Sequence, residues 1–255
     1  MKKALNEKTI GRLTRFCLNL RRGGATELNM PSFTVGFVLF PDLTQLDLTG
    51  PLQVLARLPQ SRTVVAAKSE SPVPSDCGLS LLPTHSFANC PPFDLICVPG
   101  GVKGVIGAIG DRETVDFVRR QAASAKYITS VCTGAFVVGV AGLLQGRRAT
   151  THWAYTELLP LLGAKYEKAR IVRDGNVITA GGVTAGVDFG LSVVAEIAGE
   201  TAARTIQLGI EYDPAPPFDS GHPDRAPESI KAALSERYGK ARAALRDGIT
   251  QSVMA

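Results

Sequence analysis

The sequence of 255 residues lacks the marks of several protein classes. It has no run of eighteen apolar residues, so no segment is predicted to span a membrane. Its five cysteines are odd in number and irregularly spaced, which argues against a disulfide framework and favours a reducing, cytoplasmic compartment. Neither a glycine-rich phosphate loop nor a cluster with metal-ligand spacing occurs, so we expect no cofactor and no metal.

The net charge of +5 is confined to residues 1–29. Seven of the 28 basic and two of the 23 acidic residues lie there, which leaves 21 of each in the remainder. A body with balanced charge is not expected to bind nucleic acid. The basic segment is either a targeting peptide or a non-functional extension ahead of a native start at Met30, and we favour the extension. A secretory signal is disfavoured because Arg12 and Arg15 interrupt its apolar stretches.

From Phe33 onward, apolar strands alternate with helical patterns. This alternation predicts an α/β fold of three layers, α/β/α, with a mainly parallel, doubly wound sheet that binds ligands at the carboxyl ends of its strands. Strands are expected at Phe33–Phe40, Thr63–Lys68, Phe93–Val98 and Lys126–Val131, with a hairpin around Asp174-Gly175-Asn176. Helices are expected from about Pro51 and at Asp111–Ala125, Gly134–Leu144, Gly186–Ala198, Thr201–Ile210 and Glu228–Arg246, with a loop at Asp213–Pro227.

Cys132 lies where the strand at 126–131 meets a helix that opens with small residues. A thiol on such a turn stands at the sheet edge beside unpaired helix N–H groups, which lower its pKa and favour the nucleophilic thiolate. The same turn presents the serine of many hydrolases. Free cysteine is otherwise mostly buried as a small apolar residue, which is our interpretation of Cys97. Pattern alone leaves both roles open for Cys132.

Two more strand ends carry candidate groups. The glycines of VPGG (Val98–Gly101) allow the backbone to offer N–H donors to a ligand, although a plain tight turn would use the same residues. Asp47 stands in the apolar segment TQLDLTGP, where burial would raise its pKa and suit it to proton transfer. The alternative is an aspartate that caps a helix or a turn. Because the first strand adjoins the centre of most doubly wound sheets, Asp47 and Cys132 can meet.

His152 and the single tryptophan, Trp153, occur together in the segment ATTHWAY. The histidine is a candidate base for a nucleophilic cysteine. Alternatively, the segment begins a helix, with Thr151 as its cap and Trp153 in the core. The pattern does not decide between these interpretations.

Several separate motifs resemble the DJ-1/PfpI superfamily. They are VPGG, TSVCTGAF (Thr129–Phe136), AGLLQGRRATTHW (Ala141–Trp153) and GGVTAGVDFGL (Gly181–Leu191). TQLDLTGP and GIEYDPAPPF (Gly209–Phe218) narrow the resemblance to its isonitrile-hydrating branch. It implies a class I glutamine-amidotransferase-like, flavodoxin-like catalytic domain at 30–225. Residues 226–255 would then be a C-terminal helix that packs on this domain or on a partner in a homodimer.

The resemblance implies a cofactor-free enzyme whose small-molecule substrate, an isonitrile, takes up water to become an N-substituted formamide. The family nucleophile falls on Cys132, the essential carboxylate on Asp47 and a third functional position on Thr133. In protease- and glyoxalase-like relatives a histidine follows the cysteine, so Thr133 disfavours peptidase activity and leaves His152 without a family-supported role. Residues expected to bind the substrate or stabilise charge are Gly100, Gly101, Gly182 and Val183.

In our hypothesis, Cys132 attacks the isonitrile carbon, Asp47 supplies a proton, and water then releases the formamide from a thioimidate. Two alternatives come from other classes. One is a non-catalytic sensor domain, similar to those of transcription regulators but without the DNA-binding part, for which too few residues follow Glu211. The other is a thiol redox sensor, because an exposed cysteine of low pKa oxidises readily.

Overall fold

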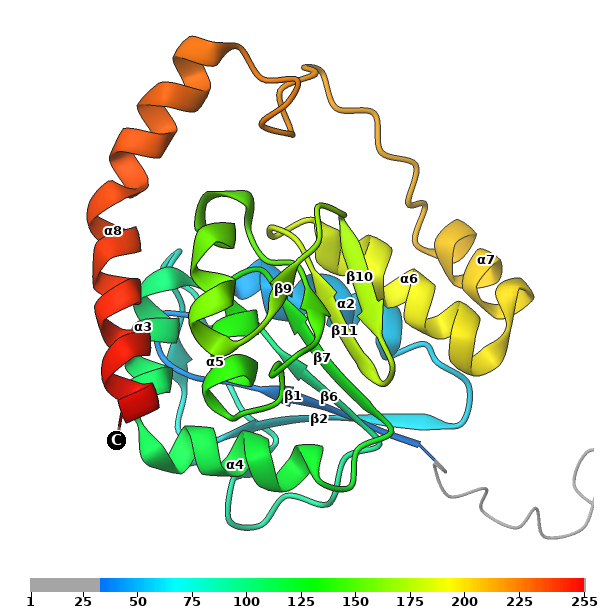
Figure 1. The fold of residues 1–255 in the computed structure, drawn as a ribbon. Helices are drawn as coiled ribbons and strands as arrows, with labels where there is room; N and C mark the ends of the chain where they lie inside the picture. The colour runs from blue at the N-terminus through cyan, green and yellow to red at the C-terminus, as the bar shows by residue number, and fades with distance from the viewer. Residues whose placement is uncertain (1–32, 255) are drawn as a thin grey trace, which may run out of the picture. The chain divides into compact units, whose positions relative to one another are not determined.

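The computed structural model describes residues 33–254, so the predictions for residues 1–29 and for a start at Met30 lie outside it. The described residues contain a seven-stranded sheet with helices on both faces (Figure 1). All neighbouring strands pair in parallel except β10 and β11, which are antiparallel. The spatial order is β10 (Ile171–Asp174), β11 (Val177–Ala180), β7 (Tyr127–Val131), β6 (Leu95–Val98), β1 (Phe33–Val38), β2 (Ser61–Ala67) and β5 (His85–Ser86).

Two groups of helices flank this sheet, which confirms the predicted three-layer α/β/α fold. One group is α2 (Gln45–Leu55), α6 (Ala185–Ala198) and α7 (Glu200–Gly209). The other is α3 (Val102–Gly110), α4 (Arg112–Ala122), α5 (Gly134–Val140), the 3₁₀ helix η1 (Trp153–Leu162) and α8 (Glu228–Met254). Two small ladders pair β3 (Val73–Pro74) with β4 (Ser80–Leu81) and β8 (Arg148–Ala149) with β9 (Lys165–Tyr166).

The central strands are apolar on both faces because both faces are covered by helices. Every residue of β1 and of β6 is buried, including Cys97, which is fully enclosed as its apolar setting predicted. The hairpin between β10 and β11 turns at Gly175 with a positive φ of 63°, as the Asp-Gly-Asn sequence predicted. None of the helices within residues 33–254 combines the length and apolar character that crossing a bilayer requires.

The helix predicted to start near Pro51 instead starts six residues earlier, and Pro51 lies inside α2. Close packing on α6 supports this helix despite the proline. A Cβ on Gly186 would lie 2.8 Å from Cδ of Pro51, and one on Gly190 would lie 2.9 Å from Cβ of Val54. The burial gained by this tight contact outweighs the local preference against proline within a helix. The correction places Asp47 in the first turn of α2.

Helix α3 was not predicted, because its sequence VKGVIGAIG is rich in glycine. One of these glycines, Gly104, is required by a close approach, since its Cβ would lie 2.6 Å from the carbonyl oxygen of Pro41. The C-terminal helix α8 extends eight residues beyond its predicted end at Arg246 and buries Leu245 and Ile249. It contacts α3, η1 and α5.

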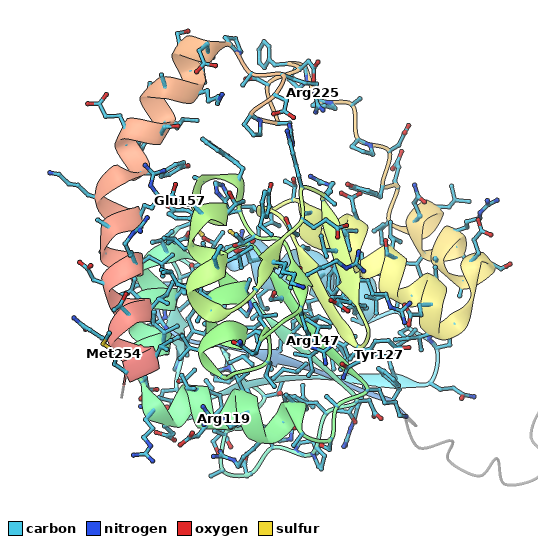
Figure 2. The ribbon with its side chains drawn as sticks, in the orientation of Figure 1. Arg119, Tyr127, Arg147, Glu157, Arg225 and Met254 are labelled. Carbon is cyan, nitrogen blue, oxygen red and sulfur yellow. The ribbon has the colours of Figure 1, made fainter. Side chains whose placement is uncertain are left out.

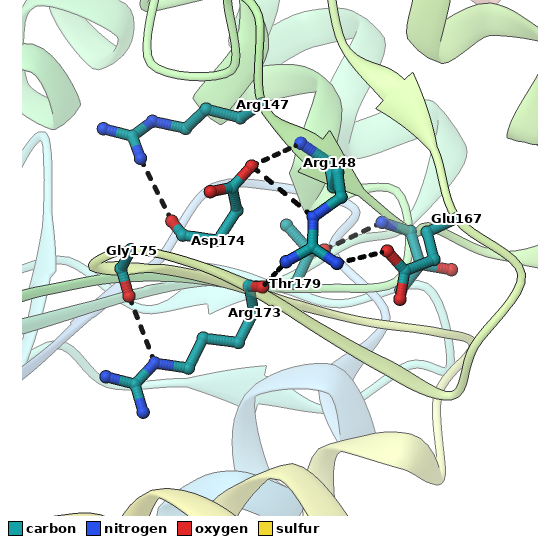
Figure 3. Close-up of polar contacts among 8 residues, drawn as sticks. Arg147, Arg148, Glu167, Arg173, Asp174, Gly175 and Thr179 are labelled. Atoms are coloured by element: carbon teal, nitrogen blue, oxygen red, sulfur yellow. Dashed lines mark hydrogen bonds and ion pairs between the residues drawn. The ribbon is translucent and has the colours of Figure 1, made fainter.

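A polar network fixes the chain segment that leads into His152 (Figure 3). The backbone N–H of Arg148 donates to Oδ2 of Asp174 over 2.8 Å, and its side chain reaches Oε2 of Glu167 over 2.8 Å. Two residues on, the N–H of Thr150 donates to Oγ1 of Thr179 in β11 over 2.8 Å. The segment from 148 to 150 is therefore tied to the edge of the central sheet.

Replacement of Gly134 by alanine is expected to destabilise the fold by about 3 kcal/mol. A Cβ at this position would lie 2.2 Å from the carbonyl oxygen of Val98, so the first turn of α5 would have to move away from β6. Thermal unfolding followed by circular dichroism should show a melting temperature lower by roughly 6–12 °C. The matched control is Gly107→Ala in exposed space on α3, which should stabilise by up to about 1 kcal/mol. Equal melting temperatures for the two variants would contradict the close approach.

Candidate active site

The structure places Asp47 and Cys132 next to each other, although 85 residues separate them in the sequence. Asp47 lies in the first turn of α2, and Cys132 lies between β7 and α5. Asp47 is fully buried, and Cys132 retains 5% of its surface. Both groups therefore stand at the carboxyl end of the parallel sheet, where ligands bind in such folds.

Cys132 has the strained backbone of a tight strand-to-helix turn. Its φ is +56°, in the left-handed region that residues other than glycine seldom adopt. Three hydrogen bonds hold this conformation: its N–H donates to the carbonyl oxygens of Ala180 (3.1 Å) and Gly181 (2.9 Å), and its own carbonyl accepts from Oγ1 of Thr151 (2.7 Å). The predicted sharp turn at the cysteine is confirmed.

The carboxyl of Asp47 is held by one oxygen only. Its Oδ2 accepts a hydrogen bond from the N–H of Gly100 over 3.1 Å. Its Oδ1 is buried and has no well-aligned partner within the described residues, although the thiol of Cys132 is near enough to lower the Asp47 pKa as a donor. Because a buried oxygen without a partner is costly, it marks a place where a proton or a bound molecule is expected.

Burial raises the pKa of Asp47 to about 7, as its apolar setting predicted. The pKa of Cys132 is also raised, first by burial and then by the nearby charge of Asp47. The N–H groups of Val183 and Thr133 lower it by less. The prediction of a low-pKa thiolate was therefore wrong, because two donors at the start of a helix do not offset the loss of water around the sulfur. Above about pH 7 the Asp47 carboxyl is ionised while the thiol keeps its proton, so the pair then holds one proton.

Gly100 and Gly101 were predicted to offer free N–H donors to a ligand, but in the structure both N–H groups form hydrogen bonds within the protein. The N–H of Gly100 is bonded to Asp47, and the N–H of Gly101 donates to Oγ1 of Thr133 over 3.0 Å. A Cβ on Gly100 would lie 2.6 Å from the nitrogen of Thr133 and 2.8 Å from Oδ2 of Asp47. Glycine is thus required here so that the carboxyl can approach the start of α5.

The donors that reach the sulfur come from two different helix starts. They are the N–H groups of Thr133, which is fully buried, and of Val183, just before α6. Val183 has a positive φ of 25°, which is strained for a β-branched residue. Gly182 precedes it, so the Gly182–Val183 segment that was expected to stabilise charge does lie beside Cys132.

His152 does not form a hydrogen bond with Cys132 within the described residues. It caps η1 itself, with Nδ1 accepting from the N–H of Ala154 over 3.3 Å. Of the two interpretations left open, the helix start is thus observed, but with His152 and not Thr151 as its cap. Thr151 instead holds the carbonyl of Cys132. Burial lowers the pKa of His152 to about 4, so the ring is neutral at physiological pH. Trp153, which the same interpretation places in the core, is partly buried and packs against the core.

Sequence reasoning missed two tyrosines close to this region, Tyr155 of η1 and Tyr238 of α8. Tyr155 belongs to the segment ATTHWAY and could have been noticed there, whereas nothing in the polar sequence of α8 singled out Tyr238. Within the part of the chain that the structure describes, no group of three or more histidine, cysteine or acidic side chains is arranged to hold a metal ion.

Comparison with known proteins finds relatives in both sequence and structure. The sequence profile of the DJ-1/PfpI family matches residues 34–196. The chain is 57% identical over 196 residues to a protein called isonitrile hydratase from Pseudomonas putida, a match that covers 77% of this chain and 86% of that protein. It is similar in structure to a THiJ/PfpI family protein from Pseudomonas syringae, with a TM-score of 0.83 and 38% identity over 90% of this chain and 99% of the other.

A third similarity is to the HTH-type transcriptional regulator GbdR of Pseudomonas aeruginosa. It is 28% identical over 200 residues, which cover 74% of this chain and 53% of the regulator. The similarity therefore spans about half of that protein.

Proposed function

The chain belongs to the DJ-1/PfpI family, and on this premise we propose that it is an isonitrile hydratase, an enzyme of the lyase class that adds water to an isonitrile to form an N-substituted formamide. The 57% identity to the isonitrile hydratase of Pseudomonas putida supports this substrate class. The observation that carries the proposal is the buried Asp47–Cys132 pair, in which a carboxyl with a pKa of about 7 lies beside a protonated thiol and Oδ1 of Asp47 has no aligned partner.

The first half-reaction uses the thiol proton. The terminal carbon of an isonitrile accepts a soft nucleophile and then needs a proton. As the sulfur of Cys132 bonds to this carbon, its proton passes to the Asp47 carboxylate, which delivers it to the same carbon. The product is a thioimidate, RN=CH–S–Cys132, and the carboxylate is regenerated. A pKa of about 7 suits Asp47 to both halves of this transfer.

The second half-reaction consumes water. Asp47 takes a proton from water as the oxygen adds to the thioimidate carbon, and it passes that proton to the nitrogen. The sulfur then leaves with the proton of the new hydroxyl, giving RNH–CHO and the free thiol. The N–H groups of Thr133 and Val183 stabilise negative charge on the sulfur when it leaves. Thr133 also links two parts of the site. Its Oγ1 accepts a hydrogen bond from the N–H of Gly101, and its own N–H reaches the sulfur.

The burial of Cys132 favours this chemistry over redox sensing. A sensor thiol is exposed and has a low pKa, whereas this sulfur is 5% exposed and its pKa is raised. A small exposed fraction of the sulfur suits an isonitrile, whose reacting carbon stands alone at the end of a linear group.

We further propose a homodimer that works in the cytoplasm. The four described cysteines are all free, which fits a reducing compartment. Large apolar side chains are exposed on and around the loop before α8, with Leu208 82%, Phe218 78% and Ile230 47% accessible. Such exposure is typical of a surface that a second copy covers, and light scattering would measure the mass of the particle.

The test is the reaction itself. Purified protein incubated with cyclohexyl isonitrile should produce N-cyclohexylformamide, identified by mass spectrometry, with one oxygen taken from labelled water. A sensor domain would yield no formamide at any protein concentration. Binding to random-sequence duplex DNA provides the contrast, and DNA binding without turnover would favour the regulator-like alternative.

A further inference from the structure

An aromatic cluster beside the reacting pair has no part in the chemistry described above. It consists of His152, Trp153 and Tyr155, from the start of η1, and Tyr238 of α8. The ring of His152 lies 5.7 Å from Trp153, 5.6 Å from Tyr155 and 5.8 Å from Tyr238, measured between ring centres. Tyr238 also faces Trp153 and Tyr155 at 6.2 and 5.9 Å. His152 and Tyr238 are thus each within contact range of the other three rings.

Two links place this aromatic cluster next to Cys132. The residue before His152, Thr151, bonds the carbonyl of Cys132 over 2.7 Å. The imidazole itself lies against Gly182, where a Cβ would come within 2.7 Å of its Cδ2. Gly182 in turn precedes Val183, whose N–H reaches the sulfur. Burial raises the pKa of Tyr155 to about 12, with smaller contributions from the neighbouring Tyr238 and Cys132.

The aromatic cluster extends outward from the buried sulfur. Tyr155 is 2% exposed, whereas His152, Trp153 and Tyr238 are only partly buried. Its members are uncharged at neutral pH, because burial keeps His152 deprotonated and Tyr155 protonated. Arg242 of α8 is occupied by the carbonyl of Ala154 and by Glu157. A surface of neutral rings fits an apolar group far better than an ionic one.

Helix α8 is held in place over η1 by its own polar contacts. Arg242 donates to the carbonyl oxygen of Ala154 over 3.3 Å, and Arg246 pairs with Glu157 over 2.9 Å. Glu157 lies on the side of η1 that faces α8 (Figure 2). The family profile ends at residue 196, so α8 and its Tyr238 lie outside the part of the chain that the profile matches. A helix that brings a ring to the cluster from outside this part can affect which substrate the site accepts.

We propose that the aromatic cluster binds the organic substituent of the isonitrile, and that Tyr238 makes α8 the element that selects bulky apolar substituents. This inference rests on the proposed function and specifies its substrate. The isonitrile carbon points to Cys132 and Asp47, and the substituent lies along the rings towards the surface. A methyl isonitrile would contact little of this surface, whereas a cyclohexyl or aryl isonitrile would contact most of it.

The kinetic test compares two substrates and two variants. Tyr238→Leu keeps apolar volume on α8 but removes the ring, and Arg237→Ala is the matched control at the neighbouring, exposed position. For cyclohexyl isonitrile we expect kcat/KM of Tyr238→Leu to fall about tenfold, mainly through KM. For methyl isonitrile it should stay within about twofold, and Arg237→Ala should match the parent with both substrates. An equal loss with both substrates would assign Tyr238 a merely structural role and overturn the proposal.

A binding experiment gives a second readout that does not depend on turnover. Trp153 is the only tryptophan of the chain, so intrinsic fluorescence reports directly on the aromatic cluster. Titration of the Cys132→Ala variant with cyclohexyl isonitrile should give a saturable change, with a Kd about tenfold weaker when Tyr238→Leu is added. No saturable change would overturn the proposal. Saturable binding to a parent protein that forms no formamide would leave this site intact and refute the proposed hydration instead.

Discussion

Replacement of Cys132 by alanine is expected to lower kcat for cyclohexyl isonitrile by roughly 10⁴-fold or more. The sulfur forms the only covalent bond between enzyme and substrate in the proposed reaction, and the alternative, direct attack of water on the isonitrile, has no comparable nucleophile. Formamide production by the purified variant, measured by mass spectrometry, gives the rate. With the parent enzyme, rapid acid quenching should trap a mass increase on Cys132 equal to that of one isonitrile.

The control for this variant is Cys77→Ala. Cys77 is exposed and does not contact the pair, so the variant should retain full activity. Formamide production by Cys132→Ala at a rate near that of the parent would rule out the thioimidate. Adduct formation without release of formamide would show that the cysteine is reactive but that the second half-reaction has been misassigned.

Asp47→Asn is expected to lower kcat by about 10³-fold, within the range that general acid–base catalysis contributes. The amide can still accept the N–H of Gly100, but it cannot take the thiol proton and return it to carbon. Asp116→Asn on the surface of α4 is the matched control, with activity unchanged. Near-parental activity of Asp47→Asn would show that another group carries the proton.

The pH dependence of kcat/KM should also reflect the protonation of Asp47. Below about pH 7 the Asp47 carboxylate takes up a proton and can no longer accept the one from Cys132. For the parent, kcat/KM should therefore fall about tenfold for each pH unit below 7 and be level just above it. The residual activity of Asp47→Asn should show no such fall. A parent profile that is flat from pH 5 to 8 would contradict the assignment.

The same variant should not be less stable than the parent at pH 8. The pKa of Asp47 is raised from its ordinary value of 3.8 to about 7, so the folded state holds this proton more tightly than the unfolded chain. That contribution to stability is lost as the pH rises through 7, when the buried group becomes charged. Asparagine has no charge to bury. A melting temperature equal to or above that of the parent would separate a catalytic role from a structural one.

The local sequence pattern was sufficient to predict most strands of the sheet. The sequence correctly predicted the apolar strands β1, β6 and β7 and the turn at Gly175. Burial on both faces of a strand requires apolar residues, and a positive φ favours glycine, so both features can be recognised from residue type. The start of α2 and the whole of α3 could not be predicted in this way. Their stability comes from close contacts between distant segments, such as Gly186 against Pro51, which outweigh unfavourable local propensity.

For the candidate site, the sequence by itself determined that a cysteine stands on a sharp strand-to-helix turn and that an aspartate follows the first strand. Only the tertiary structure decided how they behave, because desolvation and charge depend on everything that surrounds a group. Burial raises the pKa values of both Asp47 and Cys132, whereas local reasoning expected a thiolate at Cys132. The N–H groups of Gly100 and Gly101 bond Asp47 and Thr133 and are therefore not free for a ligand. Tyr238 joined the aromatic cluster from a helix 86 positions away from His152, a distance across which no spacing pattern carries information.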